Sequence, residues 1–333
     1  MFFQGWTIVA PQRERGLSGR VFSCKLVRIH RSDRRQPDHL HKWGIGMLVT
    51  RIRTSLEYEI FSASEFFLNM LVSKKSQLIL EEHLSVDYID SNGDKMPVHF
   101  QKHIDAVGGR FVSFSAQAGA INVDYTVNVV TNNARRPSEA AIYPVGRLPK
   151  KTIPCLRPSR YCESDVLSAR VQALFCAQGD GIALVESIID WIQENIQYEV
   201  GCSDSTTSAA DVFEKRKGVC RDFAHLAITF CRALNIPARF CVGYVYFEEP
   251  PQDFHAIFEA YLGGRWIKFD PTRLAPPDNL VVIARGNDAK DTPFATIFGN
   301  IKPIRMRINI AQEDPYSDFH VKAGDEQAAI IGR

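Results

Sequence analysis

Cys220, His255 and Asp270 are the residues whose types and positions could together perform nucleophilic catalysis. Cys220 begins a helix that the apolar spacing predicts over residues 219–234. The nucleophile in thiol chemistry is the thiolate, and the free N–H groups and dipole of a helix N-terminus favour it. The same N–H groups can bind a developing oxyanion. Taken alone, a cysteine here is more often a small buried hydrophobe, so the interpretation depends on its partners.

Those partners lie on a predicted hairpin, residues 255–269, whose loop is Gly263-Gly264. If the loop has two residues, the register places Ile257 opposite Asp270. His255 then projects from the same face as Ile257 and lies diagonal to Asp270, within reach of an imidazole–carboxylate hydrogen bond. A base oriented by a carboxylate is what an activated nucleophile needs. A register shifted by one residue would put Asp270 on the wrong face.

Each partner also has a purely structural interpretation. His255 alone could be a hydrogen-bonded core histidine, and Asp270 alone could be a turn carboxylate, because Pro271 follows it. The combination of all three residues is what favours catalysis. His225 competes for the role of base, but it lies about 140° around the helix axis from Cys220. We expect it to be a buried, hydrogen-bonded histidine.

The surrounding pattern divides the chain into five parts. Alternating apolar and polar residues predict an antiparallel β-sandwich domain over residues 47–132. Five prolines predict a stiff connector over residues 133–165 that lies across a surface. Helices followed by strands predict an α+β core over residues 166–300, and residues 301–333 are expected to be a C-terminal extension.

Residues 1–44 carry nine Lys or Arg residues against three Asp or Glu residues, although the whole chain has a net charge of only +2. A basic arm can bind acidic partners. This one has no aromatic interleaving and no helical period, which favours a poorly ordered leader that contributes nothing to stability. The net charge of the chain implies neither a nucleic-acid nor a membrane partner.

The eight cysteines form no C-x-x-C pair, so neither a zinc ribbon nor a thioredoxin-type motif is supported. No apolar run approaches the ~18–20 residues of a transmembrane helix. The apolar start of the chain is followed, not preceded, by charge, unlike a signal peptide. We therefore expect reduced thiols, a cytoplasmic location, and no metal or other cofactor.

Several segments occur in the order in which bacterial transglutaminase-like proteins have them, and together they cover about residues 47–300. The segment around Cys220 resembles the nucleophile motif of that family. Residues 156–162 resemble the segment that precedes its core, and the β region resembles its N-terminal domain. The motif residues are Gly218-Val219-Cys220-Arg221-Asp222-Phe223-Ala224-His225-Leu226, Asn235-Ile236-Pro237-Ala238-Arg239, Val242-Gly243-Tyr244, His255-Ala256 and Phe269-Asp270-Pro271-Thr272.

The resemblance implies a papain-like core, in which the nucleophile helix packs on an antiparallel sheet that carries the histidine and the aspartate. It implies cysteine-dependent acyl transfer on an amide or peptide-like substrate through a Cys220 acyl-enzyme. We expect hydrolysis, as by a peptidase or amidase; protein–amine transamidation and a catalytically silent binding or scaffold role are the alternatives. The resemblance places the side-chain oxyanion donor of the family near residues 205–207. The sequence has no cluster of carboxylates that would support a calcium site. The sequence leaves the substrate and the oligomeric state open.

Overall fold

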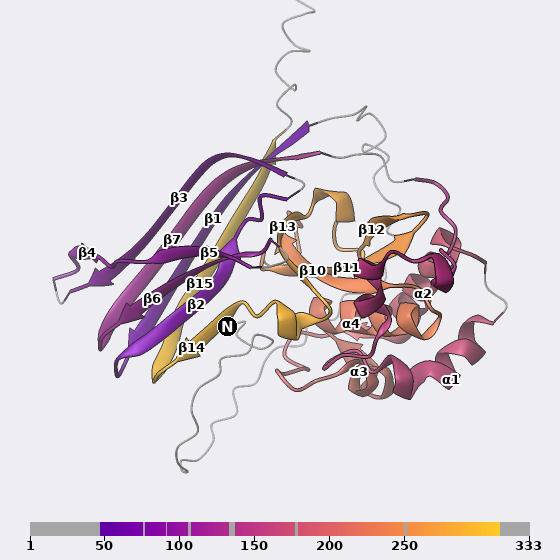
Figure 1. The fold of residues 1–333 in the computed structure, drawn as a ribbon. Coiled ribbons are helices and arrows are strands. Elements are labelled where there is room, and N and C mark those ends of the chain that lie inside the picture. Colours follow the sequence, from indigo (N-terminus) through magenta and orange to yellow (C-terminus); the bar gives the residue numbers. More distant parts are fainter. Residues whose placement is uncertain are drawn as a thin grey trace, which may run out of the picture.

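The computed structural model describes residues 47–75, 77–90, 92–105, 108–132, 137–176, 179–249 and 252–313. It contains a β-sandwich beside a body in which helices pack on a sheet (Figure 1). The α+β class and the sandwich predicted from the sequence are confirmed. The predicted leader, residues 1–44, lies outside the described residues.

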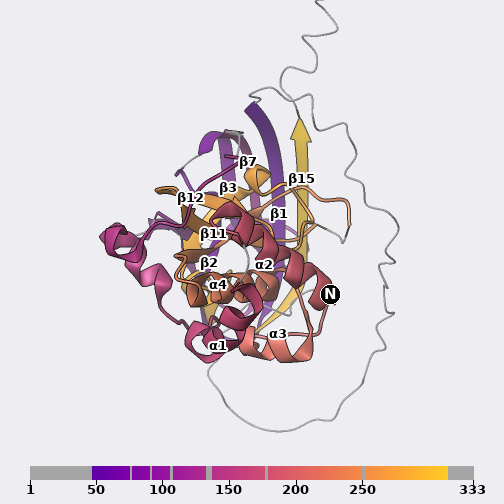
Figure 2. The same ribbon diagram turned by 90° about the vertical axis from the view of Figure 1, so that its right-hand side faces the viewer.

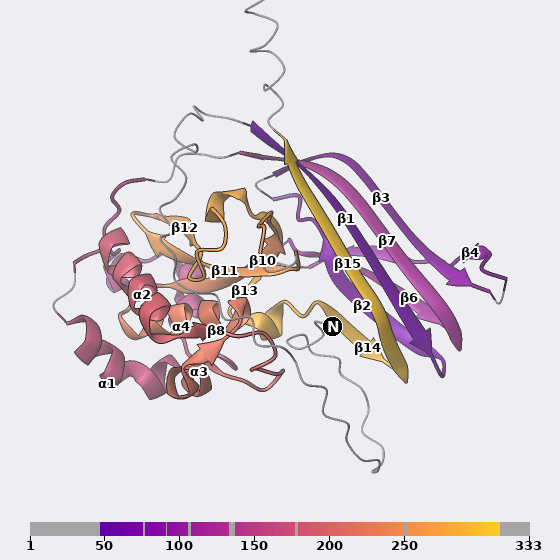
Figure 3. The same cartoon turned by 180° about the vertical axis from the view of Figure 1, so that it is seen from behind.

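The sandwich consists of two antiparallel sheets whose inner faces share one apolar core, as the alternation of the sequence predicts (Figures 1 and 3). Leu56 and Val123 enter this core from one sheet and Phe66 from the other. The first sheet has the order β15 (Ile301–Glu313), β1 (Met47–Ile60), β7 (Gly119–Asn132), β3 (Gln77–Ile89) and β4 (Lys95–Pro97). The second has the order β14 (Ala295–Phe298), β2 (Ser64–Leu71), β6 (Arg110–Ala116) and β5 (Gln101–Ile104).

Two strands from the far end of the chain complete the sandwich. β15 pairs with β1 from Ile60–Ile301 to Val49–Glu313, and β14 pairs with β2. The predicted boundaries differ from this arrangement, because they place residues 295–300 in the core and residues 301–313 in a C-terminal extension. The physical reason is that strand pairing across some 250 residues leaves no local signal of the partner.

The second body packs helices against a four-stranded antiparallel sheet (Figure 2). The sheet order is β12 (Arg265–Phe269), β11 (His255–Leu262), β10 (Ala238–Tyr244) and β13 (Val281–Gly286). The helices are α1 (Ser164–Phe175), α2 (Ile182–Asn195), α3 (Ala209–Lys215) and α4 (Cys220–Ala233). All residues of α4 after Cys220 are buried, because β10 and β11 cover one side of it and α1, α2 and α3 the other. No helix in the described part of the chain is long and apolar enough to cross a membrane.

The proline-rich connector lies across the surface of this core, as predicted, but it contains short helical turns. The N–H of Gly263 donates to the carbonyl of Ala141 at 2.9 Å, and Ile142 forms a bridge to Leu262. Further along, a 3-10 helix over Lys150–Leu156 contacts α4 and β10. The connector therefore braces the hairpin and the helix that carry the candidate catalytic residues.

Two glutamine side chains join the sandwich to the core by imitating backbone pairing. Gln77 of β3 donates to the carbonyl of Val282 at 2.6 Å and accepts from its N–H at 3.0 Å. Gln252, in the loop before β11, makes the same two bonds with Ile310 of β15, at 3.2 and 2.6 Å. Each amide thereby satisfies both polar groups of one strand residue.

We predict that a chain ending after Asn300 loses most of its stability relative to a chain ending after Glu313. The shorter chain lacks β15, which leaves one hydrogen-bonding edge of β1 unpaired and removes the buried side chains of Ile308 and Ile310. Loss of these two side chains alone costs about 4–6 kcal/mol. Thermal unfolding followed by circular dichroism compares the two chains. Equal melting temperatures would contradict an integral role for β15.

Candidate active site

Cys220 is the first residue of α4 and is half-buried. The turn before it is fixed by Asp222, whose carboxylate accepts the N–H of Val219 at 2.9 Å. A Cβ atom at Gly218 would lie 2.7 Å from the Cβ of Asp222, so this approach requires glycine. The guanidinium of Arg221 pairs with the same carboxylate at 2.9 Å, which neutralises the buried charge of Asp222. These contacts place the thiol at the helix start.

The hairpin opposite Cys220 has the predicted register. Gly263 and Gly264 form a two-residue loop with φ angles of 55° and 83°, which favour glycine at both positions. Leu262 pairs with Arg265, and the ladder continues to the pair of Phe258 with Phe269. His255 and the residue after Phe269 therefore lie near each other at the open end of β11 and β12.

The side chains of His255 and Asp270 are in direct contact, as this register predicts. Nε2 of His255 lies 3.0 Å from Oδ2 of Asp270, and the two residues are only 1% and 5% exposed. The remaining bonds of the carboxylate come from the N–H and hydroxyl of Thr272, at 2.9 and 2.7 Å, and from the N–H of Ala275, at 3.2 Å. The carboxylate is thus held in one orientation toward the imidazole.

Electrostatics favour the charged form of this pair. Burial lowers the pKa of His255, but the charge and hydrogen bond of Asp270, together with the Cys220 thiol, raise it to about 10. Burial raises the pKa of Asp270, and the imidazole of His255 more than offsets this, so that the pKa of the carboxyl is lowered. Because Nε2 faces Asp270, the nitrogen left for the thiol is Nδ1. The analogy with a serine triad predicts the opposite assignment, with Nε2 toward Cys220, and that prediction is wrong.

Tyr198 is a residue of the site that sequence reasoning missed. It belongs to β8 (Gln197–Tyr198), which runs parallel to β9 (Lys217–Gly218) and pairs Tyr198 with Gly218. Burial, followed by the charge of the Cys220 thiolate, raises the pKa of the Tyr198 phenol, and the backbone N–H of Cys220 also donates toward its oxygen. The phenol therefore stays protonated beside the thiol and can donate a hydrogen bond. A two-residue strand is too short to leave a pattern in the sequence.

Two of the expected oxyanion donors near residues 205–207, Thr206 and Thr207, have their hydroxyls engaged elsewhere. The hydroxyls of Thr206 and Thr207 both donate to the carboxylate of Asp204, at 2.7 and 3.1 Å. The carbonyl of Ser205 accepts the hydroxyl of Tyr161 at 2.8 Å. The phenol that interacts with Cys220 is instead that of Tyr198, which was not among the expected oxyanion donors.

His225 is a buried, hydrogen-bonded histidine, as predicted. Its ring stacks on Tyr161, with 5.1 Å between the ring centroids, and its Nε2 accepts the N–H of Ala289 at 3.1 Å. Burial, together with the charges of Arg221 and Arg232, holds the pKa of His225 well below its ordinary value. It remains neutral and is occupied in the core, so it does not compete with His255.

The other described cysteines lie in different settings from Cys220, and all seven described cysteines are free. Burial raises the pKa of the thiols of Cys155, Cys162, Cys231 and Cys241. Within the described residues, no three His, Cys, Asp or Glu side chains are placed to hold a metal ion.

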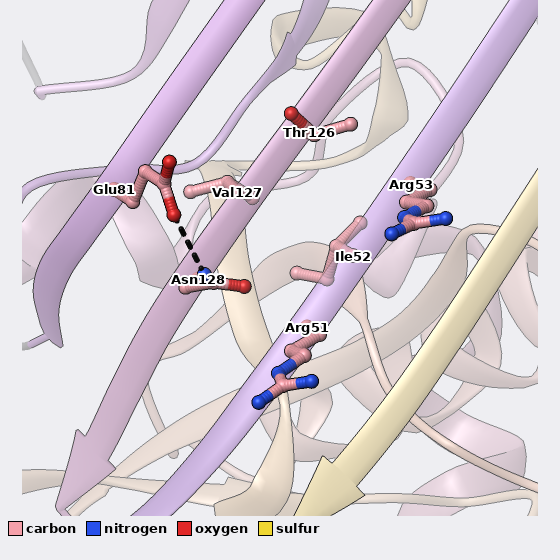
Figure 4. A pocket seen from close by; sticks show the side chains of 7 residues that line it. All are labelled: Arg51, Ile52, Arg53, Glu81, Thr126, Val127 and Asn128. Atoms are coloured by element: carbon pink, nitrogen blue, oxygen red, sulfur yellow. Dashed lines mark hydrogen bonds between the residues drawn. The ribbon is translucent and has the colours of Figure 1, made fainter.

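A surface hollow of about 410 Å³ lies on the five-stranded sheet of the sandwich (Figure 4). Arg51, Arg53, Glu81, Thr126 and Asn128 line it, and Glu81 accepts a hydrogen bond from Asn128 at 3.1 Å. None of the residues that line it belongs to the Cys220, His255 and Asp270 group. Its position therefore gives no support to a role in thiol chemistry.

We predict that the His255–Asp270 pair makes stability depend on pH. The folded protein retains the His255 proton up to a pKa of about 10, whereas the unfolded chain releases it near the ordinary value of 6.5. The stabilisation is therefore complete below the ordinary pKa of histidine, 6.5, and is lost as the pH rises through the pKa of His255 in the folded protein, about 10. Urea unfolding at about pH 6 and about pH 9.5 should show wild type losing more free energy of unfolding than Asp270→Asn. If the difference in free energy of unfolding between wild type and Asp270→Asn were the same at both pH values, the coupling of the pair to stability would be contradicted.

Comparison with known proteins agrees with this geometry. The model of the transglutaminase-like superfamily matches residues 171–271, which contain Cys220, His255 and Asp270. A solved structure from Cytophaga hutchinsonii, named "Putative Cysteine Protease", is 39% identical, covers 80% of this chain and 91% of its own, and has a TM-score of 0.73.

Two uncharacterized mycobacterial proteins are also similar. One from Mycobacterium leprae is 26% identical over 147 residues, and one from Mycobacterium tuberculosis is 28% identical over 126 residues. These matches cover 41% and 34% of this chain, which spans only 51% and 40% of the two relatives. The similarity to the solved structure extends over most of both chains, and it includes the sandwich as well as the core. The chain belongs to the transglutaminase-like superfamily.

Proposed function

We propose that this protein is a cysteine-dependent acyl-transfer enzyme that hydrolyses an amide or peptide-like substrate. The observation that carries the proposal is the buried His255, whose Nε2 is bound to Asp270 and whose pKa responds to the Cys220 thiol. A histidine held between a carboxylate and a thiol at a helix start is the arrangement that generates and stabilises a thiolate. The membership of the superfamily supports cysteine-dependent catalysis in general.

In the proposed reaction, the Cys220 thiolate attacks the substrate carbonyl carbon and forms a C–S bond. The carbonyl oxygen becomes an oxyanion, to which the protonated phenol of Tyr198 would donate. The protonated Nδ1 of His255 gives its proton to the leaving nitrogen, and the C–N bond breaks to leave an acyl-enzyme. Water then attacks the acyl carbon, returns a proton to His255 and releases the acid and the thiolate.

Asp270 would act throughout by orienting the imidazole. Its contact with Nε2 fixes which nitrogen faces Cys220, and its charge stabilises the imidazolium that pairs with the thiolate. Thr272 and Ala275 hold the carboxylate from the other side, so the orientation does not depend on the substrate.

Transamidation differs only in the last step, where an amine replaces water, and it remains the second candidate. We favour hydrolysis because water needs no dedicated acceptor site, and the described residues that surround Cys220 show no motif for one. The proposal includes a peptide or amide partner and neither a nucleic-acid nor a membrane partner. The cytoplasmic location stays a prediction.

We predict that Cys220→Ala abolishes activity without loss of the fold, since the residue is half-buried and contributes little volume. Asp270→Asn should lower kcat by about 10- to 10³-fold, less than the ~10⁴ known for a serine triad, because a thiolate–imidazolium pair depends less on its third member. His255→Ala should cost more than Asp270→Asn. A screen of peptide and amide substrates measures the activity of wild type and the three variants. It follows both ammonia release and amine incorporation, and so separates hydrolysis from transamidation. Activity that survives Cys220→Ala would end the proposal.

Thiol reactivity separates an enzyme from a catalytically silent binding module. We predict that one thiol reacts with iodoacetamide near neutral pH at least about tenfold faster than the others, because only a thiolate is nucleophilic. The fast phase should vanish in Cys220→Ala and become slower in His255→Ala. Mass spectrometry of the labelled peptide identifies the residue. Eight thiols of similar reactivity would favour the silent module.

A further inference from the structure

The hollow of about 410 Å³ on the outer face of the sandwich takes no part in the proposed reaction. Arg51 and Arg53 of β1 line it on one side and Glu81 of β3 on the other, with Thr126 and Asn128 of β7 between them (Figure 4). The register pairs Arg51 with Asn128 and Arg53 with Thr126, so these four side chains share one face of the sheet. The hollow is therefore lined by charged and hydrogen-bonding groups that suit a polar ligand.

Arg307 of β15 extends the positive charge of this face beyond the hollow. It pairs with Ser55, while Asn309 pairs with Arg53, so Arg307 is a diagonal neighbour of Arg53. Both arginines are exposed, and in the part of the chain that the structure describes neither guanidinium has an ion pair or a hydrogen bond. Arg51 has a partner of its own, but a guanidinium has five N–H donors. Arg51 and Arg307 each lie about 7 Å from Arg53 between Cα atoms, as strand geometry requires.

The carboxylates on the same face already have partners. Glu57 pairs with Arg305 at 3.4 Å, and Asp124 pairs with Lys95 at 3.2 Å. Glu81 accepts a hydrogen bond from β7 at 3.1 Å. None of these contacts involves the two arginines without partners, so the face keeps a local excess of positive charge.

We propose that this face binds an extended acidic segment of another protein, whose carboxylates contact the arginines. Alternate side chains of an extended peptide lie on one side about 7 Å apart, which matches the spacing of the three arginines. The hydroxyl of Thr126 and the amide oxygen of Asn128 supply hydrogen-bonding groups for the peptide backbone. A polyphosphate chain fits less well, because Glu57, Glu81 and Asp124 would repel its continuous charge. Such docking is independent of the thiol chemistry proposed above.

Peptide binding to the full chain, measured by calorimetry, tests the proposal. The probe is an acetylated and amidated heptapeptide in which glutamate alternates with serine. One control peptide replaces each glutamate by glutamine, and the other places the same glutamates in adjacent positions. We expect the glutamine peptide to bind at least about tenfold more weakly than the probe, and the peptide with adjacent glutamates at least about twofold more weakly. Raising the salt concentration from about 20 to about 200 mM should weaken binding of the probe several-fold.

Two variants locate the binding site. Arg53→Gln and Arg307→Gln should each weaken binding of the probe by about two- to fivefold, the range of an exposed ion pair. Lys290→Gln removes an exposed charge from the core and should leave binding unchanged. All three residues are exposed, so the variants keep the fold. Equal binding of the three peptides, or an equal loss of affinity in Lys290→Gln, would overturn the proposal.

Three further outcomes would assign the face to another occupant, and each would overturn the proposal. The first is displacement of the probe, at constant ionic strength, by inorganic phosphate or a short oligonucleotide at a lower concentration than the probe itself requires. The second is tighter binding of the probe by a full chain with amides in place of Asp314, Asp318, Asp325 and Glu326, which would assign the face to the chain's own end. The third is self-association in sedimentation that Arg53→Gln abolishes, which would assign the face to a second copy.

Discussion

The register of the hairpin formed by β11 and β12 is the constraint on which the candidate site depends. His255 and Asp270 can share a proton only because a two-residue turn pairs Leu262 with Arg265. A shift of one residue would turn one of the two side chains to the opposite face. Positive φ angles at Gly263 and Gly264 make this turn possible, and the connector fixes it from outside through Ala141. A shifted register would be strongly destabilising, since removing one member of a buried, charged pair typically costs about 3–5 kcal/mol of stability.

The helix on the other side of the site is held by buried arginines. At the first turn, directly after Cys220, Arg221 pairs with Asp222 and donates to the carbonyl of Asp204, outside the helix, at 2.5 Å. Arg232, 3% exposed, has no carboxylate partner in the described bonds; it donates instead to the carbonyls of Ala238, Arg157 and Asn287. A buried cation is tolerated only when its donors are satisfied, so these carbonyls must stay in place around the end of α4. Both ends of the helix are thereby tied to segments outside it, which leaves the nucleophile little freedom to move along or around the helix axis.

Sequence reasoning succeeds here where the physics is local. The helix of Cys220, the two strands of the hairpin, their register and the contact of His255 with Asp270 all follow from periodicity and turn chemistry over about fifty residues. It fails where pairing is distant or an element is very short. β15 belongs to a sheet whose other strands lie near the start of the chain, and Tyr198 reaches the site through a strand of two residues. Sequence reasoning also misses helix α1, although Leu167, Val171 and Phe175 are buried at four-residue spacing.

The same distant strand connects the sandwich to the chemistry of the core. Gln252 occupies both polar groups of Ile310 on the outer edge of β15, and Asp253, Phe254 and His255 follow it directly. The edge of the sandwich thus anchors the loop that leads into the catalytic strand, while the ring of Phe254 fills the junction beside Phe294. Unpairing β15 would release Gln252 and the segment that leads into His255, even if the helix and hairpin of the core stayed folded. The sandwich is therefore more than an appended domain, because one of its edge strands fixes the approach to the histidine side of the site.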